Sequence, residues 1–259
     1  WMYTSNYKYP ATTLTDSIAN DLFFVPEVIG VKIALGDHRS SFPTAQQVLA
    51  VLAEVRVGAM IAGKTGFLHI HTGNIPGAFE MYDEILAKGF PIKHIRPTHC
   101  GRIRHVFDSA VEFGKKGGWI DITTGASCCF DHPAQAVIEA VGMGVDPTHI
   151  TLSTDGHGSV PRFNEKGEMV GLGVGGVDGN LTETIRLISD CKMPIEQALL
   201  FTTKNVGDAL GLKDQGRVEV GACANACLFT EDFKLTHVVA RGRVMMRDGE
   251  VVVKGTFEI

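Results

Sequence analysis

The sequence predicts an α/β fold of the TIM type, a (β/α)8 barrel whose N-terminal strands lie outside this chain, with a small β-sandwich module in the C-terminal tail. Three observations lead to this prediction. Short apolar or β-branched runs alternate with helical patterns of about a dozen residues, as in βα units around a parallel sheet. Polar residues with metal-binding or acid–base chemistry close several of these runs. After Gly216 the pattern changes to closely spaced short strands.

The barrel strands are predicted from apolar runs that are each followed by a loop containing Gly, Ser or Pro. These runs are residues 31–35, 66–71, 95–99, 119–123 and 150–155. Apolar residues at helical spacing predict the helices that lie between and after them. These helices are residues 45–57, 78–88, 106–115, 133–141, 181–189, 194–201 and 206–210, the last ended by Gly211.

The tail is predicted as a β module because short strand-like runs follow one another with tight turns such as Asp248-Gly249. The runs are residues 217–220, 226–230, 236–240, 243–246 and 250–254. We therefore divide the chain into a partial barrel over residues 1–215 and a small β module over residues 216–259. Five barrel strands are too few to close a barrel of eight, and an isolated tail would expose its edges, so we expect further strands of the same protein before Trp1.

Composition excludes several classes of protein. The 24 basic and 29 acidic residues give a net charge of −5, and no Lys/Arg-rich run is present, so nucleic acid is not an expected partner. We expect a cytoplasmic protein without a membrane segment, because the N-terminus has no signal-peptide pattern and no run of 18 apolar residues occurs. The six cysteines show neither disulfide-framework nor zinc-finger spacing, and we expect reduced thiols.

Four residues at the ends of successive predicted strands are the candidates for chemistry. Lys32 lies in the first of these strands, and His71, His99 and Asp155 close three later ones. A single strand-end histidine is more often structural, and a single lysine can reach the surface. Together, at the active face of a barrel, they match the needs of a hydrolytic zinc site: imidazole nitrogens, an oxygen ligand and a proton acceptor. A desolvated lysine loses its charge readily and can add carbon dioxide to form a metal-binding carbamate.

The order Lys, His, His, Asp resembles the amidohydrolase superfamily, in which a His-x-His on an earlier strand completes a binuclear zinc site. Within it, the chain looks like the isoaspartyl (β-aspartyl) dipeptidases from about Met2 to its end. The segments that carry this resemblance are residues 30–32, 36–40, 97–102, 152–159 and 253–258.

The resemblance implies a role for each matched residue. Lys32 would carry the carbamate that bridges two zinc ions, and carbon dioxide would supply it. His71 and His99 would bind one zinc ion, and Asp155 would bind the other and act as general base. Tyr7 would polarise the scissile carbonyl with zinc. The substrate carboxylates would be held by Arg39, Arg102 and Ser159, because guanidinium forks suit carboxylates.

Two histidines and one glycine-rich segment have alternative interpretations. His69 and His71 form a His-x-His, but this pair follows Lys32, whereas in the superfamily the pair precedes the lysine. We therefore expect His69 to be a neutral residue of the inner layer. His157 lies beside Asp155 and is a possible substrate contact. Residues 173–179 lack the Lys-Ser/Thr of a phosphate cradle, and we expect a mobile loop near the substrate.

The sequence thus predicts a binuclear zinc dipeptidase that hydrolyses the isopeptide bond of isoaspartyl dipeptides through a metal-bridging hydroxide. One alternative is a related cyclic amidase or N-acyl-amino-acid hydrolase with the same metals. Another is a barrel without catalysis that serves a structural role. The expected partners are a small peptide substrate, the missing N-terminal segment and, by the resemblance, further copies in a homo-oligomer.

Overall fold

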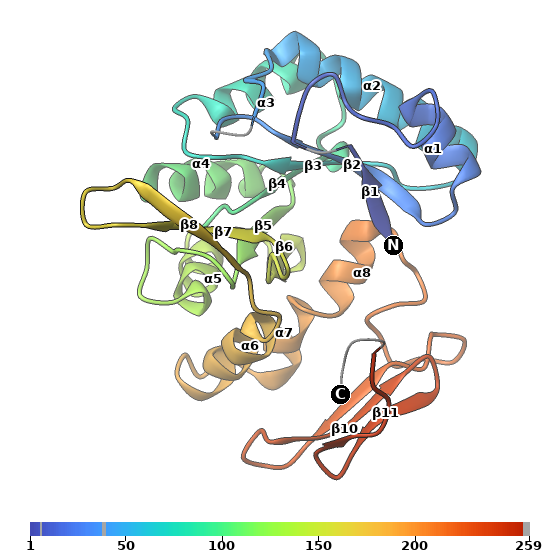
Figure 1. Ribbon diagram of the computed structural model, residues 1–259, viewed down its shortest axis with the longest axis vertical. Helices are drawn as coiled ribbons and strands as arrows, with labels where there is room; N and C mark the ends of the chain where they lie inside the picture. Colours follow the sequence, from blue (N-terminus) through green and yellow to red (C-terminus); the bar gives the residue numbers. More distant parts are fainter. Residues whose placement is uncertain (6, 38–39, 256–259) are drawn as a thin grey trace.

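The computed structural model describes residues 1–5, 7–37 and 40–255. Within these ranges, six parallel strands follow one another in chain order around an arc (Figure 1). They are β1 (Met2–Thr4), β2 (Val28–Ala34), β3 (Leu68–His71), β4 (Ile95–Thr98), β5 (Ile120–Thr123) and β6 (Ile150–Ser153). The backbone N–H of Cys100 donates to the carbonyl of Asp121 at 3.0 Å and joins the end of β4 to β5. The strands form two sheets, β1-β2-β3-β4 and β5-β6, which this hydrogen bond joins.

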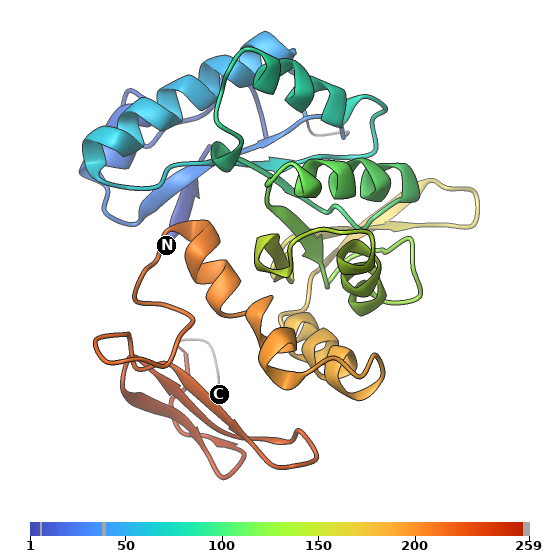
Figure 2. The same cartoon turned by 180° about the vertical axis from the view of Figure 1, so that it is seen from behind.

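Helices cover the outer side of the arc (Figures 1 and 2). They are α1 (Ile18–Phe24), α2 (Ala45–Ala62), α3 (Ala78–Ala87), α4 (Arg104–Lys115) and α5 (Pro133–Gly142), with 3-10 turns η1 (Ile92–His94) and η2 (Pro147–His149) before β4 and β6. The main core lies between these helices and the outward side chains of the strands. Each large aliphatic side chain buried there contributes about 1.5–3 kcal/mol.

Helix α2 shows how the sequence forms these elements. Thr44 and Gln47 make a reciprocal capping box at its start, and Gly63 ends it in the left-handed region, with a φ of 67°. By length and composition alone α2 could cross a membrane, but core helices pass the same test, and Val48, Leu52 and other residues of α2 are buried in the core.

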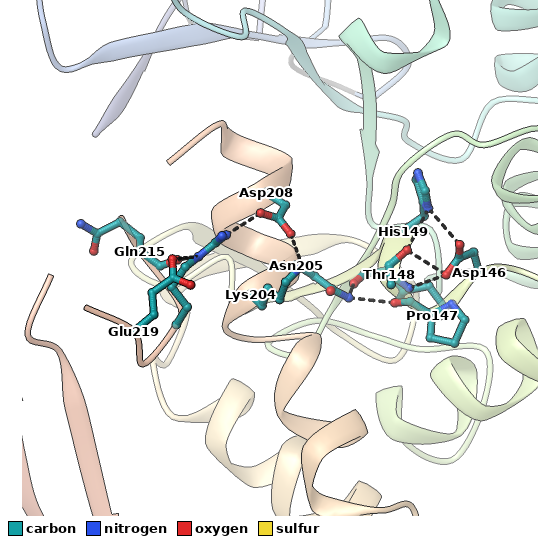
Figure 3. Close-up of polar contacts among 11 residues, drawn as sticks. Asp146, Pro147, Thr148, His149, Lys204, Asn205, Asp208, Gln215 and Glu219 are labelled. Atoms are coloured by element: carbon teal, nitrogen blue, oxygen red, sulfur yellow. Dashed lines mark hydrogen bonds and ion pairs between the residues drawn. The ribbon is translucent and has the colours of Figure 1, made fainter. Parts of the chain in front are cut away.

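Three further helices, α6 (Gly179–Ser189), α7 (Ile195–Leu200) and α8 (Lys204–Leu210), follow the arc. The buried side chain of Asn205 donates to the carbonyls of Pro147 and Ile150, both at 2.8 Å, and fixes α8 beside β6 (Figure 3). Asp208 of α8 accepts from Lys204 and Arg217, which ties α8 to the segment before the tail.

The tail forms one antiparallel sheet in the order β12 (Glu250–Val251), β11 (Arg243–Arg247), β10 (Leu235–Ala240) and β9 (Ala226–Phe229), set apart from the arc (Figure 1). The predicted turn at Asp248-Gly249 is confirmed, with φ values of 50° and 84° at its two residues. The predicted second sheet of a sandwich is not confirmed, because the described part of the tail contains this one sheet.

The structure differs from the predicted elements at several places. The predicted strand at 217–220 is wrong. The guanidinium of Arg217 donates to Asp208 of α8, and the described chain forms no strand here. Val218 and Val220 are 98% and 106% exposed. Elements that the sequence patterns did not predict are β1, α1 and a hairpin of β7 (Ser159–Phe163) and β8 (Met169–Val174). The predicted loop at 173–179 contains the end of β8 and the start of α6.

Candidate active site

Three of the predicted metal-site residues lie at the carboxyl ends of parallel strands, and Lys32 lies two residues before the end of β2. Lys32 is inside β2, His71 is the last residue of β3, His99 follows β4 and Asp155 follows β6. In the register of the sheet, Ala34 of β2 stands beside His71, and His71 stands beside Thr98 of β4. The strands thus bring these side chains to one end of the arc, as predicted for a barrel.

The two histidines are in contact with each other. The ring centroids of His71 and His99 lie 4.5 Å apart in an edge-to-face arrangement, and the residues are 1% and 3% exposed. Tyr7 extends the cluster, since its ring centroid is 5.2 Å from that of His71. The ammonium of Lys32 lies 5.8 Å from the Tyr7 ring centroid. Four candidates predicted from the sequence therefore form one cluster.

His99 is held by one ring nitrogen. Its Nδ1 lies 2.6 Å from the hydroxyl of Thr123 in β5, whereas its buried Nε2 has no hydrogen-bond partner among the described residues. Burial is the main cause that holds the pKa of His99 far below its usual value, and the positive charge of Arg102 adds to this effect. The imidazole is therefore neutral, which is the state in which histidine binds metal ions.

His71 has a partner that the sequence patterns did not identify. Oδ2 of Asp37 lies 3.2 Å from Nε2 of His71. The loops after β2 and β3 approach closely here, since a Cβ on Gly73 would come within 2.2 Å of the carbonyl oxygen of Gly36. Gly73 also has a φ of 72°, so this close approach requires glycine. The glycine pair brings Asp37 beside His71.

Several candidate residues have a left-handed backbone conformation that side chains other than glycine rarely adopt. Tyr7, His99, Asp155 and His157 have φ values of 48°, 62°, 51° and 60°. Such conformations cost about 1–3 kcal/mol each and cluster at functional sites, where the surrounding structure holds them. Two of these residues, His99 and Asp155, are also among those that the strand-end pattern selected.

A cavity of about 630 Å³ opens on the inner side of the arc. Tyr7, Lys32, Asp155 and Ser159 line it, together with residues of α8. Ser159 begins β7, and the turn before it is fixed because the N–H of His157 donates to the carbonyl of Gly175 at 3.0 Å. This volume is of the size that small-molecule sites have in other proteins.

The inner layer beneath the candidates is unusually polar. His69 stacks on Tyr3 with centroids 5.0 Å apart, and burial holds its pKa well below the usual value, followed by the charges of Lys32 and Arg96. His69 thus lies in the inner layer, and its lowered pKa favours the neutral ring that the sequence predicts. Burial also lowers the pKa of Arg96 to about 9.

Asp121 in β5 is a second polar residue of this layer that the patterns did not identify. Its carboxylate accepts hydrogen bonds from Thr98 at 2.5 Å, Thr151 at 2.7 Å and Ser153 at 2.6 Å. Burial raises its pKa, and these hydroxyls act in the opposite direction. Its hydrogen-bond partners lie on β4 and β6, so no local sequence signal could have revealed it.

The predicted substrate-binding residues are only partly brought together. Arg102 lies in the loop after β4, where its backbone N–H donates to the carbonyl of His99 at 3.1 Å. Ser159 lines the cavity on the other side. Arg39 lies outside the described residues.

A metal ion would find part of a coordination shell here. Among the described residues, no three His, Cys, Asp or Glu side chains stand together as a shell. The paired imidazoles of His71 and His99 offer nitrogen ligands of the type that zinc prefers, and the buried Nε2 of His99 is a polar atom that a metal would satisfy. These residues fit one side of a metal site.

Comparisons with known proteins agree with this geometry. The model of the amidohydrolase family matches residues 67–245. The β-aspartyl dipeptidase of Fervidobacterium islandicum AW-1, crystallised in complex with β-Asp-Leu dipeptide, is 34% identical, with a TM-score of 0.91 over 99% of this chain and 67% of that chain. Another crystal structure of a β-aspartyl dipeptidase from this organism gives 31% identity and a TM-score of 0.86 over 99% of this chain and 66% of that one.

More distant structures share only the fold. The N-acetylglucosamine-6-phosphate deacetylase of Pasteurella multocida is 13% identical, with a TM-score of 0.56 over 85% of this chain and 57% of that chain. This chain spans about two thirds of the length of the β-aspartyl dipeptidase chains. The family match and the similarity along nearly the whole chain show that this chain belongs to the amidohydrolase family, with its TIM-barrel type of fold, and that it resembles the β-aspartyl dipeptidases.

Proposed function

We propose that the protein containing this chain is a zinc metallo-dipeptidase that hydrolyses the isopeptide bond of β-aspartyl dipeptides. The observation that carries the proposal is the cluster of His71, His99, Tyr7 and Lys32 at the strand ends, beside a cavity that Asp155 and Ser159 also line. The 34% identity to a β-aspartyl dipeptidase supports the substrate class.

The residues of this chain would divide the metal binding between them. Lys32, carrying a carbamate made from carbon dioxide, would bridge two zinc ions, with His71 and His99 on one and Asp155 on the other. When bound, zinc lowers the pKa of water and polarises a carbonyl. Neutral imidazoles suit metal binding, because histidine binds a metal ion through an uncharged ring nitrogen. Lys32 would lose its proton before it adds carbon dioxide.

The remaining groups would act on the substrate. The Asp155 carboxylate would accept the proton of the attacking water and pass it to the leaving amine. The Tyr7 hydroxyl would donate a hydrogen bond to the carbonyl oxygen as negative charge develops there. Arg39, Arg102 and Ser159 would hold the two carboxylates of the dipeptide, which fixes the scissile bond over the cluster.

The proposal includes chain beyond this sequence. An additional segment of the same protein would supply the strands that close the arc between β6 and β1, as well as the other half of the metal shell. It would also supply a second sheet for the tail, in which β9 is exposed and β10 is only partly buried. The length of the relatives supports such a segment. We further propose a cytoplasmic homo-oligomer, following the resemblance.

The substrate proposal is tested by comparing hydrolysis of β-Asp-Leu, α-Asp-Leu, a hydantoin and an N-acyl-amino acid by the zinc-supplemented protein. We expect cleavage of β-Asp-Leu above all. Arg102→Ala should raise the KM for β-Asp-Leu about tenfold or more, because a hydrogen bond to a charged group contributes about 1.5–3 kcal/mol. Arg104→Ala, which removes a surface ion pair with Asp108, is the matched control.

Two results would favour the rivals. Turnover of the hydantoin or the N-acyl-amino acid that Arg102→Ala leaves unchanged would indicate a related amidase. A protein that binds zinc but hydrolyses none of these compounds would indicate a structural role.

A further inference from the structure

The parallel strands divide into two groups between β4 and β5. In the described part of the chain, β1 to β4 form one sheet, and β5 and β6 form another. Two of the candidate residues lie on different sides of this seam, since His99 follows β4 and Asp155 follows β6. Among the described residues, no continuous ladder of backbone hydrogen bonds joins the two groups. The distance between His99 and Asp155 therefore depends on individual contacts that cross the seam.

Asp121, the second residue of β5, contacts β4 and its end with both its backbone and its side chain. Its carbonyl accepts from the N–H of Cys100 at 3.0 Å, and Oδ2 of its carboxylate accepts from the hydroxyl of Thr98 at 2.5 Å. The same Oδ2 accepts from the hydroxyl of Ser153 in β6 at 2.6 Å, and Oδ1 accepts from Thr151 at 2.7 Å. One buried carboxylate thus links β4 with β6.

These contacts lie close in the chain to the two candidate residues. Thr98 directly precedes His99, and Ser153 stands two residues before Asp155. His99 and Asp155 both have a left-handed backbone, with φ values of 62° and 51°. Such strained conformations persist only where the surrounding structure holds them. The carboxylate of Asp121 holds the residues from which both strained segments start.

We propose that Asp121 is a positioning residue that holds the end of β4 against the end of β6 and so fixes His99 relative to Asp155. The inference rests on the proposed function, which assigns these two residues to the two metal ions of one site. A carboxylate suits this task, because each of its oxygens can accept more than one hydrogen bond. An apolar residue at position 121 would leave the buried hydroxyl of Thr98 without this acceptor and the seam without this link.

The side chains around Asp121 provide a matched pair of variants. Thr98→Val removes the hydroxyl that crosses the seam, whereas Thr151→Val removes a hydroxyl that lies beside Asp121 within the β5–β6 sheet. Both changes keep the shape of the side chain and remove one hydrogen bond to the same carboxylate. Positioning across the seam predicts that only Thr98→Val has a large effect, whereas a purely structural role predicts similar effects of both. Thr98→Ser keeps the hydroxyl and is the rescue variant.

The first test is hydrogen exchange at single-residue resolution on the complete protein, which requires no substrate. The amide of Cys100 should exchange about tenfold or more faster in Thr98→Val than in the wild type, because local opening becomes easier where a link is lost. The amides of Leu35 and Thr124, which donate to carbonyls within the first and the second group of strands, should keep their rates. Unchanged exchange at Cys100 in Thr98→Val would overturn the inference.

The second test is kcat for β-Asp-Leu. Thr98→Val should lower kcat about 10–100-fold, since a displacement of about 1 Å within a site can cost about 10²-fold. Thr98→Ser should recover most of the activity, and Thr151→Val should keep it. Similar losses in Thr98→Val and Thr151→Val, or a wild-type kcat in Thr98→Val, would contradict the positioning role. If the wild type cleaves no β-Asp-Leu while the Cys100 amide responds as expected, the proposed function fails and the link through Asp121 stands.

Discussion

At the scale of the residue, the left-handed backbone of Asp155 connects stability with function. A φ of 51° is strained for most side chains, but asparagine and aspartate tolerate it better than others do. This tolerance makes Asp155→Asn a clean variant, because the amide keeps the shape and the backbone conformation and loses the basic carboxylate.

Asp155→Asn should lower kcat for β-Asp-Leu about 10²–10⁴-fold, the usual contribution of a general base. The unfolding midpoint should stay close to that of the wild type. Steady-state kinetics and denaturant unfolding check both expectations, with Asp190→Asn at the exposed residue that follows α6 as the control. A variant that keeps full activity would remove Asp155 from the mechanism.

Tyr7→Phe separates the hydroxyl of Tyr7 from its ring. The ring contacts His71 and Lys32, so the phenylalanine variant should keep the packing of the cluster. Loss of a hydrogen bond made only as charge develops on the carbonyl should lower kcat about 10²–10³-fold with little change in KM. An increase in KM at constant kcat would instead indicate that Tyr7 only binds the ground state.

At the scale of the element, the segment before α1 depends on one buried carboxylate. Asp21 accepts hydrogen bonds from the backbone N–H groups of Leu14 at 2.8 Å and Thr15 at 2.7 Å, and from the hydroxyls of Thr4 and Thr15. Burial by itself raises the pKa of Asp21, but these hydrogen bonds outweigh it and hold the pKa below its usual value. The carboxylate thus joins β1, the following loop and α1.

Asp21→Ala should lower the free energy of unfolding by roughly 3 kcal/mol at neutral pH, since each buried donor left unsatisfied costs about 1–3 kcal/mol. Because the folded pKa is depressed, the stabilisation is complete above the ordinary value of about 3.9 and is lost as the pH falls through the folded value. Denaturant unfolding at several pH values should show the wild-type advantage shrinking below about pH 4. A constant advantage down to about pH 2 would contradict this.

Sequence periodicity predicted the elements that are buried on one side. The strands β2 to β6 and the helices α2 to α5 place apolar residues at regular spacing, and all were predicted within a few residues. β1 is short, and the β7–β8 hairpin is exposed and rich in glycine, so neither carries an apolar pattern. Residues 217–220 have valines at strand spacing, but the described chain places no strand beside them. Arg217 instead donates to Asp208 and holds this segment against α8.

The candidate site was predictable where chemistry coincides with a strand end, or where the family resemblance marks a residue, as it does Tyr7. Lys32, His71, His99 and Asp155 were found in this way. Asp37, Thr123 and Asp121 were not, because their importance depends on partners that are brought close by the sheet and are distant in sequence. Side-chain partnerships of this kind follow from the register of the strands, which a single sequence does not display.

At the scale of the whole molecule, the arc of parallel strands places a polar inner surface around a cavity of about 630 Å³. His71 and His99 offer one half of a metal shell on that surface, and Lys32 and Asp155 line the cavity beside them. The chain spans about two thirds of the length of its β-aspartyl dipeptidase relatives. The proposed function makes this chain the larger part of a zinc-dependent dipeptidase.

The most direct test is the rate of β-Asp-Leu hydrolysis by the complete protein that contains this chain, measured before chelation, after removal of metal by a chelator, and after zinc and bicarbonate are restored. If the protein is a zinc-dependent β-aspartyl dipeptidase, cleavage falls to background on chelation and returns with zinc. Cleavage that survives complete metal removal, or no cleavage by protein that holds its full complement of zinc, would contradict it.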